Sequence, residues 1–549
     1  MNSVIILLLC TAALILGYIF YACKIEALFG IDPQRQTPAH TRQDGVDYIP
    51  ARNWLVLFGH HFSSIAGAGP IVGPAIAVCI WGWVPALMWI VFGSILLGGV
   101  HDYGALMCSV REGGVTIGDV AAISISRKAK LVLSIFTLLA LILVIAVFAF
   151  LGADTFVQQP KIVVPSFGII PLAIVVGLAL YRFQWNAAAV TVAALAAVGG
   201  MIFAGNWLPV ELNANSTATW MVVLLVYCYI ASVIPVNILL QPRDYLSSFL
   251  LAAGILLAFV GILVSHPDMN APAFIANKGS LGYLWPMMFI TIACGANSGF
   301  HCLVASGTTS KQLSHESHAK LIGYGGMLME GFLAAIVVIL IVGGFSLAEF
   351  NGHIAAQTSP INMYGLGFGN VTAPLLGPWG MFIALTILNA FILTTLDTAT
   401  RIARYVAQEL FGIKNRYIAT LIVAVSAGWL ALGKDSANTP LWKLIWPAFG
   451  ASNQLVAALA FLVISCWLLS KDRPIRYSFI PAIFMLATSV TALCFQIVTY
   501  WQNKQILLIV ISLVLLVSAF YLGVEVIRMF RRKKKSQNKL FESSGLRSG

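Results

Sequence analysis

Apolar segments long enough to cross a lipid bilayer recur along almost the whole sequence. They run for about twenty residues each and alternate with short polar pieces, which is typical of a polytopic helical membrane protein. Of the 549 residues, 59% are hydrophobic and 9% are charged, against about 25% charged in an ordinary soluble domain. We therefore predict an all-α polytopic membrane protein with about fifteen transmembrane helices. The predicted spans are residues 3–23, 53–80, 84–109, 131–152, 165–181, 187–205, 217–239, 246–265, 281–305, 322–345, 375–398, 416–432, 443–469, 478–499 and 505–528.

The positions of lysine and arginine predict how the chain sits in the membrane. If the basic tail RRKKK (531–535) is cytoplasmic and the loops alternate, 27 of the 32 Lys and Arg residues fall in cytoplasmic segments. Cytoplasmic loops of membrane proteins are enriched in these residues. We therefore expect a multi-pass protein of the cell inner membrane, with its N-terminus outside and its C-terminus in the cytoplasm.

The composition also excludes several classes of function. The net charge of +12 does not indicate a nucleic-acid partner, because its largest block is the tail, which would contact anionic membrane lipids. The sequence has no P-loop, no HExxH pattern and no polar segment long enough for a soluble enzyme domain. The nine cysteines form no CxxC pair and no metal-ligand spacing. We expect no enzyme activity, no cofactor and no metal site.

One predicted span, 53–80, contains residues that interrupt a transmembrane helix. Its sequence NWLVLFGHHFSSIAGAGPIVGP combines two histidines, two serines, four glycines and two prolines. A continuous helix of this length would be about 42 Å long, which exceeds the hydrocarbon core of about 30 Å. We predict a break near Gly67–Pro70, which would free backbone groups to bind an ion or a substrate. A proline kink that only shapes packing is the alternative.

A second predicted span, 217–239, leads into YIASVIPVNILLQPRDYL and is interrupted at Pro235 and Asn237. Five spans separate the starts of the two interrupted segments, so they would cross the membrane in opposite directions. Broken helices at matching places in inverted halves mark the midplane site of many secondary transporters. The predicted division is 1–52 for an N-terminal helix and cytoplasmic loop, 53–398 for a core with repeats 53–205 and 217–398, 399–528 for accessory helices and 529–549 for the basic tail.

Further motifs follow the interrupted span in order along the chain. They are VHDYGALMCSVREGG (100–114), QPRDYLSSF (241–249), CGANSGFHCLVASGTTSKQL (294–313), YGGMLMEGF (324–332), LDTATRIARY (396–405) and WPAFGASNQLVAALA (446–460). Together with the segment at 53–74, they resemble the carbon starvation protein A family over roughly residues 50–460. The segment CGANSGFHCLV differs from the usual family motif at Asn297 and Cys302, where an apolar residue and a serine are more common. This difference affects the expected substrate more than the mechanism.

This resemblance implies an inner-membrane nutrient carrier with a fold like that of the amino acid–polyamine–organocation superfamily. The core of that superfamily is LeuT-like, with two inverted repeats of five helices that contain broken helices. Members of the family are associated with uptake of peptides and of pyruvate, and the resemblance implies proton coupling for the pyruvate carriers.

The candidate substrate-binding residues lie at the expected breaks and on the span 281–305. His60 and His61 are consecutive and would point about 100° apart on a helix, so we expect one of them to face the pathway. A membrane histidine otherwise forms packing hydrogen bonds. The expected substrate contacts are His60, His61, Ser63, Ser64, Gly67, Gly69, Pro70, Asn237, Asn297, Ser298 and His301.

Three acids are candidates for proton coupling. Glu330 lies among Met and Gly with no basic residue one turn away, so we expect it to be neutral or paired across helices. Asp102 is deep enough to need a partner, such as a histidine of a neighbouring helix. Asp397 precedes Arg401 by four residues, the spacing of an ordinary helical ion pair, so a structural role is its first interpretation. We expect Asp244 at the membrane interface.

Hydroxyl groups near the end of span 281–305 suggest a second coupling ion. In the superfamily that the chain resembles, hydroxyls of the eighth core helix form a sodium site with carbonyls of the first. Ser306, Thr308 and Thr309 would do so here. Serine and threonine equally cap and pack helix ends. We expect Asn453 and Gln454 to join helices by hydrogen bonds outside the core.

These residues predict a secondary active transporter. We expect it to import a small carboxylate nutrient, pyruvate or short peptides, by proton-coupled alternating access. A sodium-coupled symporter of the same fold is the alternative. A channel that does not concentrate its substrate, or a membrane receptor that binds without flux, would use the same polar residues.

Overall fold

The structure is a computed structural model, which describes residues 2–212, 216–434 and 441–543. These residues are almost entirely helical, and they include one short hairpin in which β1 (Lys278–Gly279) pairs antiparallel with β2 (Gly282–Tyr283). The helices up to residue 265 are α1 (Ser3–Leu16), α2 (Ala22–Phe29), α3 (Pro38–Thr41), α4 (Trp54–Ile65), α5 (Gly69–Trp81), α6 (Trp83–Gly93), α7 (Gly99–Arg111), α8 (Ile117–Ser124), α9 (Arg127–Gln158), α10 (Val163–Gly177), α11 (Ala187–Trp207), α12 (Ser216–Val233) and α13 (Leu240–Ser265). The helices that follow are α14 (Phe289–Thr291), α15 (Ala293–Ala296), α16 (Gly299–Gly307), α17 (Gly326–Gly343), α18 (Leu347–Ala355), α19 (Pro360–Leu376), α20 (Gly380–Phe411), α21 (Arg416–Leu432), α22 (Leu441–Ser470), α23 (Arg476–Gln502) and α24 (Ile506–Ser543).

Each predicted span has a helical counterpart. Eleven helices of the described residues are long and apolar enough to cross a membrane, and the bent pair α4–α5 makes a twelfth if it counts as one span. The other three predicted spans correspond to shorter or interrupted helices, namely α12, α14–α16 and α21. The predicted number of fifteen crossings is therefore not confirmed and stays a prediction.

The predicted break near Gly67–Pro70 is confirmed. Residues 66–68 separate α4 from α5, and the two helix axes differ by 42°. Pro70 lies in the first turn of α5, where its missing N–H costs no hydrogen bond. A Cβ at Gly67 would lie 2.6 Å from a ring carbon of Phe148, so a glycine is needed for α9 to approach the break this closely.

The predicted break at Pro235 and Asn237 inside a span is wrong. α12 ends at Val233, and residues 234–239 form the connection to α13, because a proline ring cannot continue the helical hydrogen bonds. The second interrupted element lies in the predicted span 281–305. There α15 ends and α16 begins on either side of two extended residues, Asn297 and Ser298, whose φ angles are −166° and −116°.

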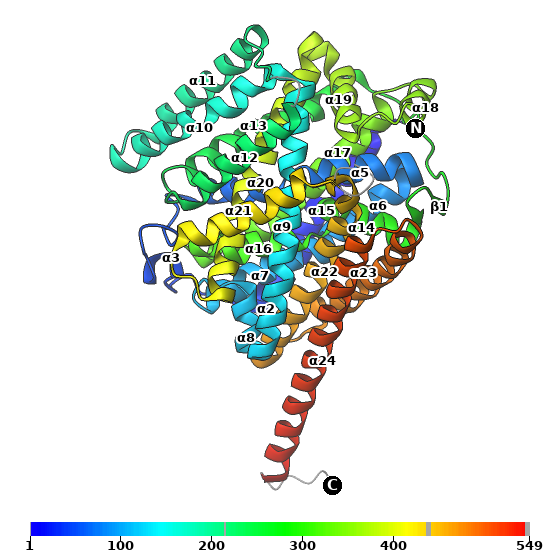
Figure 1. The fold of residues 1–549 in the computed structure, drawn as a ribbon. Helices are drawn as coiled ribbons and strands as arrows, with labels where there is room; N and C mark the ends of the chain where they lie inside the picture. Colours follow the sequence, from blue (N-terminus) through cyan, green and yellow to red (C-terminus); the bar gives the residue numbers. More distant parts are fainter. Residues whose placement is uncertain (1, 213–215, 435–440, 544–549) are drawn as a thin grey trace.

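The two interrupted elements lie inside the bundle (Figure 1). The long helices α9 and α20 pack along each other through its middle, and α13 packs against α4. α16 packs against α7 and α22, and α17 packs against α5. α10 and α11 form an outlying hairpin, whereas α18 and α19 lie at the end of the bundle that carries the N-terminus (Figure 1).

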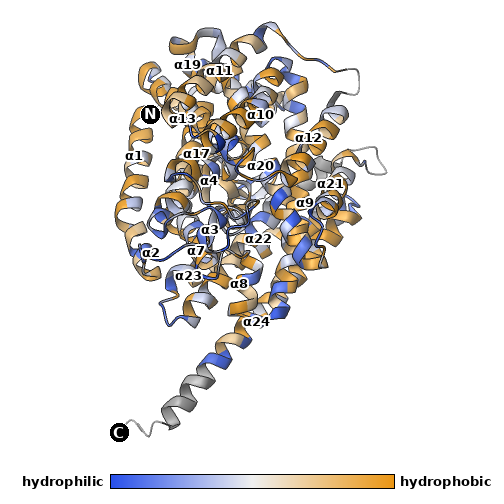
Figure 2. Cartoon of the chain, turned by 90° about the vertical axis from the view of Figure 1, so that its left-hand side faces the viewer, coloured by the Kyte–Doolittle hydropathy of each residue, from blue (hydrophilic) through white to orange (hydrophobic). Residues whose placement is uncertain are grey.

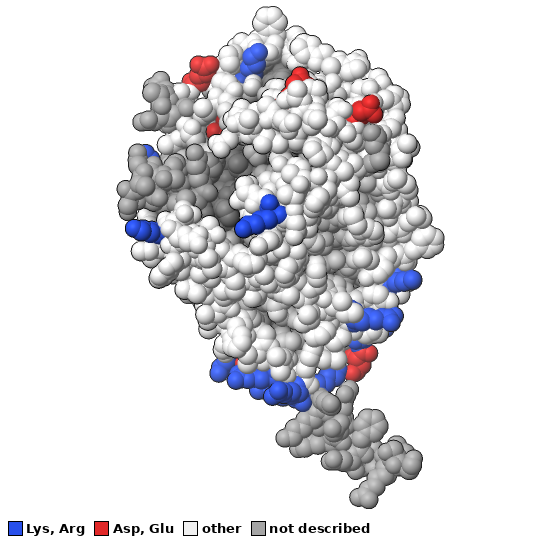
Figure 3. Space-filling model, turned by 90° about the vertical axis from the view of Figure 1, so that its right-hand side faces the viewer, with Lys and Arg blue, Asp and Glu red and all other residues white. Residues whose placement is uncertain are grey.

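The surface follows the membrane pattern. Figure 2 shows apolar residues over the sides of the bundle. Figure 3 shows Lys and Arg gathered around the end from which α24 projects. We call this the inner end, following the orientation predicted from the Lys and Arg positions. α24 continues through Ser543, and residues 544–549 of the predicted tail lie outside the described residues.

Candidate substrate and proton site

Hydroxyl groups of α20 bind the end of α4 at the first break. Thr394 Oγ1 donates to the carbonyl oxygen of Ser63 (2.7 Å), and Thr395 Oγ1 donates to that of Ser64 (3.0 Å). The hydroxyl oxygens of Ser64 and Thr398 lie 3.2 Å apart. The last carbonyls of an α-helix have no partner within the helix, and here another helix supplies the donors. The predicted residues Ser63 and Ser64 therefore lie at the break, with their carbonyls already bonded.

Asn453 of α22 bridges the second break. Its Oδ1 accepts a hydrogen bond from the backbone N–H of Phe300 (2.8 Å), and its Nδ2 donates to Ser298 Oγ (3.0 Å). Asn453 thus caps α16 from a different helix. The expectation that it joins helices is confirmed, but its place at a break was not predicted, because it lies beyond the predicted core. Asn297 is fully buried, and its amide has no hydrogen-bond partner among the described residues.

A cavity of about 70 Å³ lies between the two breaks. Gly69, Cys294 and Asn453 are among the residues that line it. A Cβ on Gly69 would lie 2.3 Å from Cys294 Sγ, so the start of α5 and the helix α15 are in contact here. Since one water needs roughly 10–15 Å³ of such space, the cavity has room for about five waters.

Four buried side chains form a chain of carboxylates and imidazoles beside the second break. His301 Nδ1 lies 2.9 Å from Asp102 Oδ2, and His301 Nε2 lies 3.0 Å from Glu330 Oε2. His101 Nδ1 lies 2.9 Å from the other oxygen of Asp102. The expected histidine partner of Asp102 and the expected cross-helix partner of Glu330 are therefore one residue, His301. The imidazole therefore lies within ion-pair distance of two carboxylates, of which only that of Asp102 has hydrogen-bond geometry to it.

His60 belongs to a second buried network. Its Nδ1 lies 2.6 Å from Asp244 Oδ2, and its Nε2 lies 3.1 Å from Thr308 Oγ1. The hydroxyl of Ser63 donates to the carbonyl oxygen of Asp244 (2.8 Å). The expectation of an interfacial Asp244 is wrong, because this carboxylate is fully buried between α4 and α13. Arg243 compensates its charge at 2.6 Å.

Asp397 is paired across helices and not along its own helix. The guanidinium of Arg243 binds both of its carboxylate oxygens, one of them at 3.0 Å, and the Tyr227 hydroxyl donates to it at 2.9 Å. The expected pair of Asp397 with Arg401 is therefore wrong. Arg401 instead binds Asp47 at 2.9 Å and carbonyls near the end of α12. Those carbonyls have no partner within their helix and attract the guanidinium.

His61 faces a different neighbour from His60, as the helix geometry predicts. His61 Nδ1 lies 2.9 Å from Thr309 Oγ1, and its Nε2 is buried without a partner among the described residues. A Cβ on Gly326 of α17 would lie 3.0 Å from His61 Cδ2. Gly326 precedes Glu330 by one turn on the same helix face. The unpaired nitrogen of His61 therefore lies near the face of α17 that carries Glu330.

The predicted sodium residues do not meet the carbonyls of the first break. Ser306 Oγ donates to the carbonyl of Cys302 (2.7 Å), while the hydroxyls of Thr308 and Thr309 face the two histidines. The reason is that residues 306–309 end α16, whereas α20 runs beside the break. No group of three or more His, Cys, Asp or Glu side chains within the described residues is arranged to hold a metal ion.

Comparison with known proteins agrees with this architecture. The structure resembles that of a mutant manganese transporter from Eremococcus coleocola, with a TM-score of 0.54 and 12% sequence identity over 88% of this chain and 99% of that chain. The sequence model of the family described as "Carbon starvation protein CstA" matches residues 2–351 and 346–492. The chain belongs to the carbon starvation protein CstA family.

Curated relatives in the CstA family are transporters. The "Peptide transporter CstA" of Escherichia coli K12 is 31% identical over 89% of this chain and 80% of the relative. The "Pyruvate/proton symporter BtsT" of the same strain is 30% identical over 87% and 79%. A Bacillus subtilis "Peptide transporter CstA" is 29% identical over 99% of this chain and all of its own length. The present CstA-family chain is thus a multi-pass membrane transporter and not an enzyme.

Residues 44–52 of this CstA-family transporter, which we call the strap, belong to the predicted cytoplasmic loop 24–52 and pack against the C-terminal part of α20. Asp47 of the strap accepts hydrogen bonds from three side chains of α20: Arg401 (2.9 Å), Arg404 (3.2 Å) and Tyr405 (2.7 Å). Burial alone would raise the pKa of the Asp47 carboxyl, but Arg404, Arg401 and Lys311 lower it to about 2. The strap leads directly into α4, so its position is tied to the first break.

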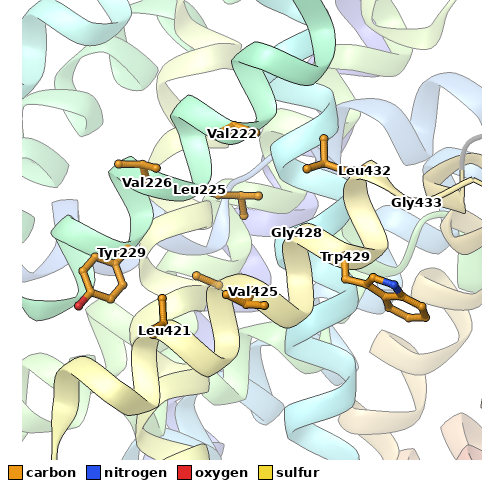
Figure 4. A pocket seen from close by; sticks show the side chains of 11 residues that line it. Val222, Leu225, Val226, Tyr229, Leu421, Val425, Gly428, Trp429, Leu432 and Gly433 are labelled. Carbon is orange, nitrogen blue, oxygen red and sulfur yellow. The ribbon is translucent and has the colours of Figure 1, made fainter.

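A larger groove of the CstA-family bundle, of about 680 Å³, lies away from these networks. Figure 4 shows it between α12 and α21, with Tyr229 and Trp429 at its edges. The rest of its lining is apolar and faces outward from the bundle. The lining residues that the structure describes carry no charge, so they offer no ionic contact to a carboxylate.

Proposed function

We propose that this protein imports a small carboxylate nutrient, pyruvate first among the candidates, by proton-coupled alternating access. An Escherichia coli relative is named as a pyruvate/proton symporter, and the fold is that of a transporter. The single observation that carries the proposal is the placement of His301 between Asp102 and Glu330, directly after the second break.

The charges of this group favour proton uptake. With both carboxylates ionised and His301 protonated, the three residues carry a net charge of −1. Uncompensated charge is costly inside a membrane, so one further proton is stabilised there. The protons belong to the coupled group and not to one member of it. Movement of one proton through the group, from outside to inside, would drive uptake.

The site for the substrate would lie between the two breaks. The cavity of about 70 Å³ matches a compact anion better than a di- or tripeptide, which would require a larger space. Gly69 and Asn453 line this cavity and would contact the substrate, whereas Asn297, whose amide has no partner among the described residues, is not part of its lining. Asn237 lies in the α12–α13 connection, so we no longer place it at the substrate.

The two broken elements also suggest how the repeats are arranged. We place α4–α5 and α14–α16 as the matching interrupted elements of two inverted halves. The second half would then begin near residue 284 and include α22, which supplies Asn453 at its own break. This division differs from the predicted boundary at residue 217.

Sodium coupling is the second candidate mechanism. The carbonyls of Ser63 and Ser64, together with the hydroxyls of Thr394 and Thr395, form a cluster of oxygens at the first break. Oxygen atoms are the ligands that hard cations prefer. The proton mechanism is favoured, because no carboxylate among the described residues bonds to these oxygens, whereas the His301 group contains two carboxylates.

The test is uptake of labelled pyruvate into proteoliposomes under an imposed inward proton gradient without sodium. We expect accumulation that collapses with a protonophore and that unlabelled di- and tripeptides do not inhibit. Uptake of labelled peptide instead would overturn the substrate, and a requirement for sodium would overturn the ion. Counterflow exchange distinguishes the carrier from a channel, and binding without flux would indicate a receptor.

A further inference from the structure

Lys311 is a buried cation without an ionic partner. Its side chain is 6% exposed, and it forms no hydrogen bond or ion pair within the part of the chain that the structure describes. Its ammonium lies over the ring of Tyr405 at 3.6 Å and near that of Tyr48 at 5.4 Å. Taking an ammonium out of water is costly unless it is paired, and contacts with aromatic rings return only part of that cost.

The acids nearest to Lys311 are bonded to other groups. Asp47 accepts hydrogen bonds from Arg401, Arg404 and Tyr405. Glu409 accepts one from the Thr116 hydroxyl and lies 3.9 Å from Lys130. Both acids act on Lys311 only at a distance beyond ion-pair contact. The three donors of the ammonium are therefore uncommitted.

The position of Lys311 connects the interior with the inner end. Thr308 and Thr309, just before it in the chain, contact His60 and His61. Just after it, the carbonyl oxygen of Gln312 accepts a hydrogen bond from the strap (3.0 Å). Lys311 thus lies between the histidine layer and the strap. A substrate that left the breaks past His60 and His61 toward the strap would meet the Lys311 ammonium.

We propose that the Lys311 ammonium is an inner binding site for the carboxylate of the transported substrate, which it holds after the strap has moved and before release. This assignment rests on the proposed function. Movement of the strap would remove Tyr48 and Asp47 from Lys311 and leave the ammonium facing the open inner mouth. An ammonium and a carboxylate then form charge-assisted hydrogen bonds, which are among the strong ones. Burial lowers the pKa of Lys311 to about 8, so most of its population is charged near neutral pH.

Transport measured separately from the two faces tests this site. Labelled pyruvate uptake is compared in right-side-out and inverted membrane vesicles that contain the full chain. We expect Lys311→Met, which keeps the length of the side chain, to raise the KM in inverted vesicles about tenfold, the scale of one charge-assisted hydrogen bond. The KM in right-side-out vesicles should change less than about twofold, and Lys311→Arg should restore much of the inner-face affinity.

The matched control is Lys320→Met, because Lys320 is already paired with Glu26 at 2.6 Å. It should leave both KM values unchanged. An unchanged inner-face KM in Lys311→Met would overturn the proposal. Equal increases of the KM at both faces would also overturn it, because they would indicate a structural role for Lys311.

Labelling of the wild-type chain gives a second measurement that does not depend on a variant folding. Acylation of Lys311 by an amine reagent in inverted vesicles is followed by mass spectrometry. Pyruvate should slow the labelling, and neutral acetone should not; labelling that ignores pyruvate contradicts the site. If wild-type vesicles transport no pyruvate, pyruvate is not the substrate and the proposed function is refuted. A dipeptide that the vesicles do transport is then used in the same labelling experiment, and protection of Lys311 by it tests the carboxylate site independently.

Discussion

The Nε2 atom of His301 lies 3.0 Å from Oε2 of Glu330, and neither side chain is exposed to solvent. The other nitrogen of the same imidazole faces Asp102 at 2.9 Å. The three groups come from α7, α16 and α17, so a change in how these helices pack also changes how the groups share protons. Under the proposed function, this relationship would link the state of the second break to the protonation of the interior.

Replacing Glu330 by Gln should uncouple transport from the proton gradient. The amide keeps the shape of the side chain but cannot carry a proton. Concentrative uptake of pyruvate should fall to simple equilibration and lose its pH dependence, while exchange of labelled for unlabelled pyruvate continues. Uptake and counterflow in proteoliposomes at several external pH values check this. Glu211→Gln at an exposed position is the control, and accumulation by Glu330→Gln equal to wild type would contradict the role.

Replacing Asp397 by Asn should destabilise the protein more than it changes coupling. The substitution leaves the fully buried guanidinium of Arg243 with one carboxylate, that of Asp244. Removing one partner of a buried pair costs about 3–5 kcal/mol. Thermal unfolding in detergent should show a clear loss relative to Glu211→Gln. A normal melting temperature with altered proton coupling would instead support the predicted proton-coupling role of Asp397.

The first break could be predicted from the sequence, and the second could not, for a physical reason. Pro70 lacks the N–H that would continue the preceding helix, and the glycines beside it are weak helix formers, so the local sequence itself indicates an interruption. Asn297 and Ser298 have no such requirement, and their extended backbone depends on Asn453, which is more than 150 residues away in the chain. A capping interaction between distant helices leaves no local pattern.

The pairings of charged residues could not be predicted from the sequence either. The spacing of Asp397 and Arg401 satisfies the rule for a helical ion pair, yet Arg243 from α13 competes successfully for the same carboxylate. Asp244, beside a loop in the sequence, is buried because α13 begins earlier than its apolar run indicates. In each case the partner comes from another helix, so the tertiary packing decides the pairing.

Replacing Gly69 by Ala should abolish transport, because a Cβ there would lie 2.3 Å from the Sγ and 2.5 Å from the Cβ of Cys294. The contact between α5 and α15 would have to open, and the cavity beside it would change shape. The second substitution Cys294→Gly removes both clashing atoms and should restore uptake. Gly352→Ala, at a position with open space, is the control for the glycine change. Full activity of Gly69→Ala alone would show that the two breaks need not touch.

The stability of the protein should depend on Lys311 in a pH-dependent way. Its amino group has an ordinary pKa of 10.5, which burial lowers to about 8 in the folded chain. Between these two values the unfolded state binds more protons, so the free energy of unfolding rises with pH across this window. Below about pH 8 the buried charge is a net penalty of roughly 3 kcal/mol, since each pKa unit corresponds to about 1.4 kcal/mol. Lys311→Met should therefore melt at a higher temperature than wild type at pH 7, and the difference should shrink as the pH rises toward about 10. Lys414→Met, at an exposed position, should show no such dependence. A constant difference across the pH range would mean that Lys311 does not titrate in the folded protein, and that its effect on stability comes from packing alone.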